Sequence, residues 1–267
     1  MALLSLVYVT WIGVLYFKQR EMLFPGAQRE APDQYPMPAR GERVWLDVFG
    51  AEVEAWFLPR DGDRSPELAP TVLFMHGNAE LIDDFGDKFW VFRQAGANVM
   101  LVEYPGYGRS GGEPGQDSLS EAVRQAYDYL LTRDDVDAND IVAMGRAMGA
   151  GPLCVVSRER DFSALILQST FTSITDVAAR YLAPSFIVRD PFDNLSAVRD
   201  FRGPILIAHG RQDGVVGYSH GVQLSRAGRA HMMTWNCHHA DCPPDWPEFL
   251  ESVLDFLRYF GLMKTGA

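Results

Sequence analysis

The sequence is poor in cysteine and in basic residues. Its three cysteines, Cys154, Cys237 and Cys242, are too few for a disulfide framework. Only 24 Lys and Arg stand against 35 Asp and Glu, so the net charge is −11. This deficit argues against binding to nucleic acid, because that affinity depends on basic residues that neutralise phosphates. We also find no internal repeat and no low-complexity tract. The hydrophobic content of 47% is nevertheless normal for a globular protein with a sizeable core.

Charge is also absent from the N-terminal segment, residues 2–17. As a helix it would span roughly 24 Å, slightly less than a hydrocarbon core of about 30 Å. A cleaved signal peptide has its basic residues before the apolar run, whereas Lys18 and Arg20 follow it here. A buried core helix that is apolar on all sides is unusual at a chain end. We therefore predict a membrane anchor within residues 1–24, attached through residues 1–17, with a cytoplasmic domain.

The rest of the chain, residues 25–267, alternates short apolar runs with helical segments. A linker with four prolines over 25–40 precedes a hairpin of 43–47 and 53–58. Buried strands are predicted at 71–75, 99–102, 141–144, 164–167, 204–208 and 231–235. Helices are predicted at 83–95, 119–131, 148–157, 219–227 and 246–260, the second capped by Asp117 or Ser118. This alternation predicts one α/β domain whose mostly parallel sheet has helices on both faces.

Residues 169–200 interrupt this rhythm. The segment is long, aromatic and proline-bearing, and it connects two predicted strands. Insertions of this kind often cover an active site. It is either such a cap or an irregular helical crossover without a role in substrate choice.

The stretch "MGRAMGAG", residues 144–151, follows the strand predicted at 141–144. Gly145 and Gly149 form the frame of the sharp strand-to-helix turn that presents a catalytic serine in some hydrolases. The central position of that frame is Ala147. The chain thus has the turn of a nucleophile without the nucleophile.

Other polar motifs also follow predicted strands. They are "HGNAE" at 76–80, "EYPGYGRSGG" at 103–112, "HGRQDGVV" at 209–216 and the pair His238 and His239. In parallel sheets, ligands bind at the carboxyl ends of the strands. Asp213 followed by a histidine supplies the carboxylate and imidazole of a Ser–His–Asp triad. The motif at 103–112 has an equally good explanation as a plain glycine-rich turn.

These motifs carry a family resemblance over nearly the whole length. The anchor is followed by "REMLFPG", "FMHGNAE", "EYPGYGRSGG", "MGRAMGAG", "RDPFDNL", "PILIAHGRQDGVV" and "HHAD". The chain resembles the α/β-hydrolases, and more narrowly their membrane-anchored branch that includes protein depalmitoylases. The resemblance implies that Ala147 occupies the position of the nucleophilic serine, in a motif that usually reads Gly-Arg-Ser-x-Gly. It also implies that Asp213 is the triad acid and His239 the base. In the family a glycine commonly precedes this base, and His238 takes its place here.

The same resemblance implies the rest of the site. The oxyanion hole would consist of the backbone N–H of Met148 and that of Asn78 or Ala79. Further residues expected to line the site are His76, Gly77, Tyr104, Arg146, Phe171 and His238.

We predict no metal and no cofactor. Cys237, His238, His239 and Cys242 lie close together, but a structural zinc site usually takes its ligands from paired motifs, and the chain has no second pair. Cys237 and Cys242 are instead either packed as ordinary core residues or joined in a disulfide in an exported domain.

Alanine cannot act as a nucleophile. One hypothesis is a serine hydrolase of acyl esters, thioesters or amides, with lipid-like substrates, whose serine was replaced to trap an uncleaved ligand. The alternative is a natural pseudoenzyme that serves as a membrane-associated acyl-ligand binding or scaffold protein. The otherwise complete triad favours the first hypothesis. We make no prediction of oligomeric state.

Overall fold

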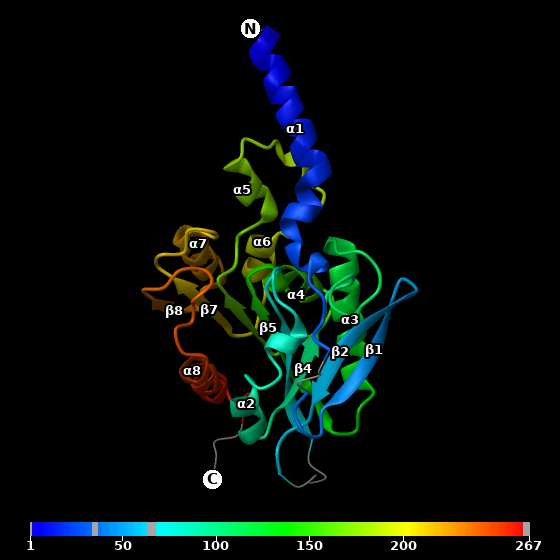
Figure 1. Ribbon diagram of the computed structural model, residues 1–267. Coiled ribbons are helices and arrows are strands. Elements are labelled where there is room, and N and C mark those ends of the chain that lie inside the picture. The colour runs from blue at the N-terminus through cyan, green and yellow to red at the C-terminus, as the bar shows by residue number, and fades with distance from the viewer. Residues whose placement is uncertain (1, 34–36, 63–67, 264–267) are drawn as a thin grey trace.

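The computed structural model describes residues 2–33, 37–62 and 68–263 and contains one sheet of eight strands (Figure 1). The strand order is β1-β2-β4-β3-β5-β6-β7-β8. The predicted hairpin is present as β1 (Glu42–Val48) and β2 (Ala51–Leu58), and both its strands run antiparallel to their neighbours. The remaining strands are mutually parallel: β3 (Ala69–Met75), β4 (Asn98–Val102), β5 (Val136–Arg146), β6 (Ala164–Gln168), β7 (Ile205–Gly210) and β8 (His231–Trp235). The predicted α/β fold is confirmed.

Strands buried on both faces explain the continuous apolar runs of the sequence. In β3, Leu73 and Met75 belong to one hydrophobic core, and Val72 and Phe74 belong to the other. This alternation is the two-residue period of a strand. The first core is covered by α3 (Gln116–Leu131), α4 (Ala150–Val156), α6 (Asn194–Asp200) and α7 (Tyr218–Gly228), and the second by α2 (Trp90–Gln94) and α8 (Trp246–Tyr259).

The predicted helix over 83–95 is wrong in its first half. The chain forms a 3₁₀ turn, η2 (Ile82–Asp84), then further turns, and only the five residues of α2 are helical. The Asp84 carboxylate accepts the Leu81 N–H and Asp83 pairs with Arg109. These two acids therefore close a turn and reach a distant loop.

The expected cap of α3 is also wrong. Its N-cap is Gly115, and the hydroxyl of Ser118 donates to the carbonyl of Glu113. The N–H of Gln116 is bound instead by the Asp190 carboxylate, at 2.7 Å. The cap thus comes from a segment distant in the sequence. The predicted linker begins with a 3₁₀ turn, η1 (Pro25–Gln28), and its residues 34–36 lie outside the described residues.

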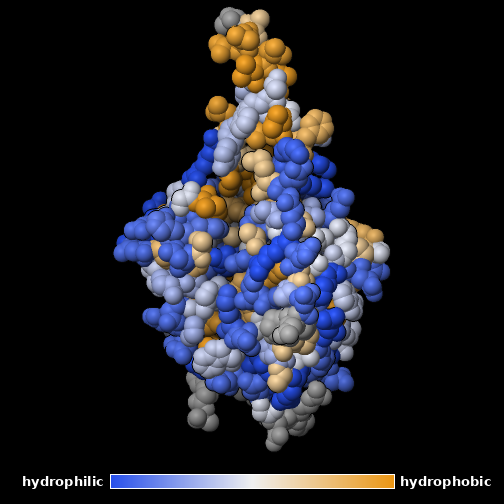
Figure 2. Space-filling view, in the orientation of Figure 1, coloured by the Kyte–Doolittle hydropathy of each residue, from blue (hydrophilic) through white to orange (hydrophobic). Residues whose placement is uncertain are grey.

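The N-terminal helix α1 (Ala2–Leu23) is longer than the apolar run that predicted it. By length and composition it is the one helix of the described residues that qualifies to cross a membrane. It projects from the domain beside α5 (Ile174–Ala179), and its projecting end is covered with apolar side chains (Figures 1 and 2). Toward its C-terminus it packs against the domain, where Leu15 is buried, and farther out its Tyr8 and Trp11 side chains donate hydrogen bonds to the 169–200 segment.

Candidate active site

The turn after β5 brings Ala147 to the carboxyl edge of the sheet. Ala147 begins a 3₁₀ turn, η3 (Ala147–Gly149), and adopts a left-handed backbone conformation with φ of 47°. This conformation costs a non-glycine residue about 1 kcal/mol. The flanking positions require glycine because other backbone atoms come too close for a side chain. A Cβ at Gly145 would lie 2.5 Å from Cα of Ala150, and a Cβ at Gly149 would lie 2.3 Å from the carbonyl oxygen of Met75. The stretch forms the strained turn that the sequence predicted.

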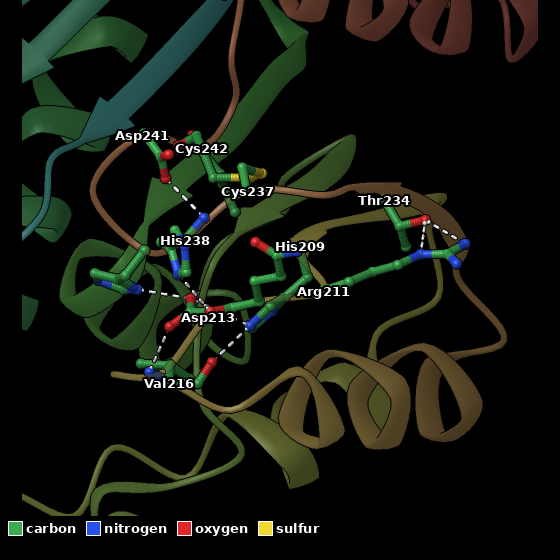
Figure 3. Close-up of a disulfide and its surroundings, with 12 residues drawn as sticks. His209, Arg211, Asp213, Val216, Thr234, Cys237, His238, Asp241 and Cys242 are labelled. Carbon is green, nitrogen blue, oxygen red and sulfur yellow. Dashed lines mark hydrogen bonds and ion pairs between the residues drawn. A yellow bond between two sulfur atoms is a disulfide. The ribbon is translucent and has the colours of Figure 1, made fainter.

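Asp213 follows β7, and both its carboxylate oxygens are engaged (Figure 3). Oδ1 accepts the N–H groups of Val215 at 3.0 Å and Val216 at 2.8 Å, and Oδ2 lies 2.7 Å from Nδ1 of His239. Burial alone would raise the pKa of Asp213, but the hydrogen bonds from His209 and His239 lower it well below its usual range. The group is therefore a carboxylate at neutral pH.

The structure separates the two adjacent histidines. His239 Nδ1 meets the Asp213 carboxylate, so this nitrogen carries a hydrogen and Nε2 lies on the opposite side of the ring. His238 Nδ1 lies instead 2.9 Å from the carbonyl of Gln212, and its side chain is exposed. Of these two adjacent histidines, it is His239 that contacts the Asp213 carboxylate as a triad base does.

The loop with both histidines is closed by a disulfide between Cys237 and Cys242, whose Cα atoms lie 5.4 Å apart (Figure 3). Of the two alternatives for these cysteines, the structure contains the disulfide. Within the described residues, no group of three or more His, Cys, Asp or Glu is arranged to hold a metal ion.

The loop after β3, with Asn78 and Ala79, is held from several sides. The hydroxyl of Tyr107 donates to the carbonyl of Asn78 at 2.8 Å, and the Gly26 N–H donates to the same carbonyl at 3.0 Å. Asn78 Nδ2 donates to the carbonyl of Leu23 at 2.8 Å. The expected oxyanion loop is therefore attached to the C-terminal end of α1.

Three residues expected to line the site are buried. His76 and Tyr104 are fully buried, and Phe171 is nearly so. The hydroxyl of Tyr104 donates to the carbonyl of His76, while His76 Nε2 lies 2.6 Å from Glu103 Oε1 and Nδ1 lies 2.8 Å from the Gly77 carbonyl. Because each ring nitrogen meets an oxygen acceptor, the imidazole supports the loop from beneath.

The buried pair of His76 and Glu103 predicts a pH dependence of stability. Full burial alone would lower the pKa of His76, but the Glu103 carboxylate raises it above the ordinary value. A histidine whose pKa is higher in the folded than in the unfolded protein stabilises the fold fully at pH values below its unfolded pKa, about 6.5. This stabilisation is lost as pH rises through the pKa of the folded protein. In urea titrations, the free energy of unfolding of the Ala147 protein should therefore exceed that of its His76→Gln variant. This difference should be larger at about pH 6 than at about pH 9. An equal difference at both pH values would contradict this assignment.

Comparison with known proteins identifies the family of this chain. Residues 66–189 match the family described as serine aminopeptidase S33. The "alpha/beta hydrolase domain-containing protein WAV2" of Arabidopsis thaliana is 30% identical over 237 residues, which cover 79% of this chain and 75% of that protein. The chain belongs to the α/β-hydrolase family.

A further relative and two solved structures extend the comparison. The uncharacterized protein YfhR of Salmonella typhimurium is 28% identical over 206 residues, which cover 71% of this chain and 70% of that protein. A propionate-bound esterase of Thermogutta terrifontis has a TM-score of 0.69 at 14% identity, covering 86% of this chain and 97% of that one. The Pyrococcus furiosus esterase Pf2001 has a TM-score of 0.67 at 14% identity, covering 86% and 98%. At these identities the solved structures show the fold alone.

Sequence reasoning missed one feature of this α/β-hydrolase, the ion pair between Arg146 and Glu80. Arg146 Nη1 lies 2.8 Å from Glu80 Oε1, while Glu80 Oε2 accepts the Gly77 N–H at 2.7 Å. Arg146 Nη2 donates to the carbonyl of His239 at 3.2 Å. The pair thus ties together the turn at Ala147, the loop after β3 and the histidine loop. Arg146 was expected only to line the site, and nothing in the local sequence signals its contact with a loop far along the chain.

Proposed function

We propose that this site is built to hydrolyse an acyl ester or thioester through a serine at position 147, and that with Ala147 the chain binds its substrate without cleaving it. The observation that carries the proposal is the contact between Asp213 and His239, together with the strained turn at Ala147. Asp213 would orient His239, which would take the proton of the serine and return it to the leaving group. The N–H groups of Met148 and of Asn78 or Ala79 would bind the oxyanion.

The substrate class of this proposal is a lipid-like acyl group, as in the depalmitoylase branch that the sequence resembles. Supporting it is α1, whose apolar side chains Leu3, Leu4 and Phe17 are each more than 70% exposed. An enzyme held at a bilayer meets substrates that are dissolved in that bilayer. Amide substrates fit the same chemistry, since the attack on the carbonyl is the same.

Ala147 itself favours a second candidate function, an acyl-ligand binding or scaffold protein. A natural pseudoenzyme would keep the fold without needing the triad. The contact of Asp213 with His239 favours the first candidate, because a carboxylate that orients an imidazole has a clear use in hydrolysis. A serine codon at position 147 in the natural gene supports the hydrolase, and an alanine codon supports the scaffold.

A fluorophosphonate probe tests the proposed function directly, because it reacts with a serine that a neighbouring histidine activates. The Ala147→Ser protein should become labelled, whereas the Ala147 protein should not. Labelling of both proteins at another residue, or of neither, would contradict the proposal.

We further propose that α1 holds the protein in a membrane. Leu15 and Phe24 are buried against the domain, whereas residues 2–11 are exposed, so the N-terminal half of α1 is the portion that would enter a bilayer. After carbonate extraction, the full-length protein should stay in the membrane pellet, and a chain that begins at Leu15 should be released. Full-length protein in the supernatant would exclude membrane insertion.

Two features favour opposite sides of that membrane. Lys18 and Arg20 favour a cytoplasmic domain, whereas the disulfide of Cys237 and Cys242 is typical of exported proteins. A cytoplasmic domain therefore requires both cysteines to be thiols in the cell. Alkylation of freshly isolated membranes, before and after reduction, distinguishes the two sides.

A further inference from the structure

The loop that follows α5 is both apolar and exposed. Residues 181–188, which we call the apolar loop, contain no charged residue. The side chains of Tyr181, Leu182 and Phe186 are 52%, 71% and 85% exposed. Leu182 also adopts a left-handed backbone conformation with φ of 57°, which is unfavourable for a residue other than glycine. A group of exposed apolar side chains of this kind marks a surface that contacts another protein or a membrane.

The apolar loop runs along α1 (Figure 1). At one end Gln19 Nε2 donates to the carbonyl of Ile187 at 3.0 Å, and at the other the hydroxyl of Tyr8 donates to the carbonyl of Leu182 at 3.1 Å. Tyr8 and Gln19 are about 16 Å apart along the helix axis. Leu182 therefore lies about 13 Å beyond Phe17, the last residue of the apolar run, toward the N-terminus. A bilayer that receives α1 as far as Phe17 would surround this end of the loop as well.

The backbone of the loop near Leu182 is hydrogen-bonded as hydrocarbon requires. The carbonyl of Leu182 accepts the Tyr8 hydroxyl, and the carbonyl of Tyr181 accepts Nε1 of Trp11 at 2.9 Å. The N–H groups of residues 180–183 all donate to carbonyls of α5. In water an exposed carbonyl bonds to solvent, whereas in hydrocarbon it needs a partner within the protein. Tyrosine and tryptophan are also the side chains enriched at membrane interfaces. These contacts favour lipid over water or a second protein as the surroundings of this part of the loop.

The part of the loop nearer Gln19 is less completely bonded. The N–H groups of Ser185 and Phe186, which begin the 3₁₀ turn η4 (Ser185–Ile187), have no partner among the described residues. This turn ends at Ile187, beside Gln19 and thus beyond the apolar run of α1. Free N–H groups are acceptable there, because headgroups and water lie at that level of a bilayer.

From these contacts we infer that the apolar loop enters the bilayer together with the N-terminal half of α1, so that the membrane holds the domain at two places. The inference rests on the proposed attachment of α1 to a membrane, but it does not depend on hydrolysis. A single helix would let the domain turn about the helix axis, and the loop adds a second contact that prevents this. The 169–200 segment also reaches the candidate active site, since the hydroxyl of Thr170 donates to the carbonyl of Ala147 at 2.8 Å. The two contacts would thus fix the orientation of that site relative to the bilayer.

A fluorescent label on the loop tests this inference. The full-length Ala147 protein is reconstituted in phosphatidylcholine vesicles, with the polarity-sensitive dye NBD attached at Leu182→Cys or, as a matched control, at Tyr259→Cys. Tyr259 is 79% exposed and packs beside His231, the first residue of β8, at the opposite edge of the sheet. Cys154, the free cysteine, is buried and should not react with the dye. The label at position 182 should have blue-shifted emission and lose intensity when the acyl chains of the lipid are brominated, whereas the label at position 259 should show neither effect.

A third label, at Leu4→Cys, separates the inference from the proposed attachment of α1, because Leu4 is 73% exposed near the start of that helix. Quenching by brominated lipid at position 4 without quenching at position 182 would overturn the inference and keep the attachment of α1. Quenching at neither position would reject both. A blue-shifted label at position 182 that brominated lipid does not quench would show that another protein chain covers the loop, which also overturns the inference. Thermal unfolding checks that each labelled variant is folded, and Phe186→Cys replaces Leu182→Cys if the latter does not fold.

Discussion

Replacing Ala147 by serine should raise the turnover of an acyl ester such as p-nitrophenyl butyrate by on the order of a millionfold. The reason is that the replacement adds the one missing atom to a site that already orients a base. Asp213 holds Nδ1 of His239 at 2.7 Å, and the backbone at position 147 already has the strained conformation of a nucleophile turn. The added hydroxyl needs no new backbone arrangement, so little stability should be lost.

The measurement is kcat for the Ala147→Ser protein against that of the Ala147 protein in the same detergent. Ala147→Gly serves as the control, because it relieves the left-handed backbone without supplying a nucleophile. A folded Ala147→Ser protein with no more activity than Ala147→Gly would show that the site lacks another part of the machinery.

The fold was predictable where local sequence determines the structure. β4 and β6 are continuous apolar runs because they are buried on both faces, and Gly145 and Gly149 stand where the backbone comes too close for a Cβ. Motifs at the carboxyl ends of such strands must meet at one edge of the sheet. This is why Asp213 and the histidine loop were expected together, although they are 26 positions apart.

The parts that sequence did not predict depend on contacts across the fold. The local sequence predicted a helix at Asp83, but this residue pairs with Arg109 in the structure. Likewise, α3 is capped by Asp190, which lies 74 positions away in the sequence. The partner of Arg146 is likewise set by how two loops pack, which gives no local periodicity. Similarly, the family resemblance gave His76 as a lining residue, but its burial against Glu103, a contact across the fold, was not predicted.

The choice between the two histidines predicts the second large effect. In the Ala147→Ser protein, His239→Ala should lower kcat by on the order of a millionfold, to the rate that binding and the oxyanion hole alone provide. His239 is the residue whose Nδ1 meets Asp213, and no other side chain in that loop replaces this contact among the described residues.

His238→Ala is the matched control, because it removes the same side chain from the adjacent position. Within the part of the chain that the structure describes, the His238 ring hydrogen-bonds only to the carbonyl of Gln212, and the residue is exposed. Its loss should therefore cost about 1 kcal/mol, a factor below about tenfold in kcat. The measurement is kcat for ester hydrolysis at several pH values, with fluorophosphonate labelling as a second readout. If His238→Ala abolished turnover and His239→Ala spared it, Asp213 would have to exchange its imidazole partner during the reaction. The contact in the structure would then describe a resting arrangement of the loop rather than the reacting one.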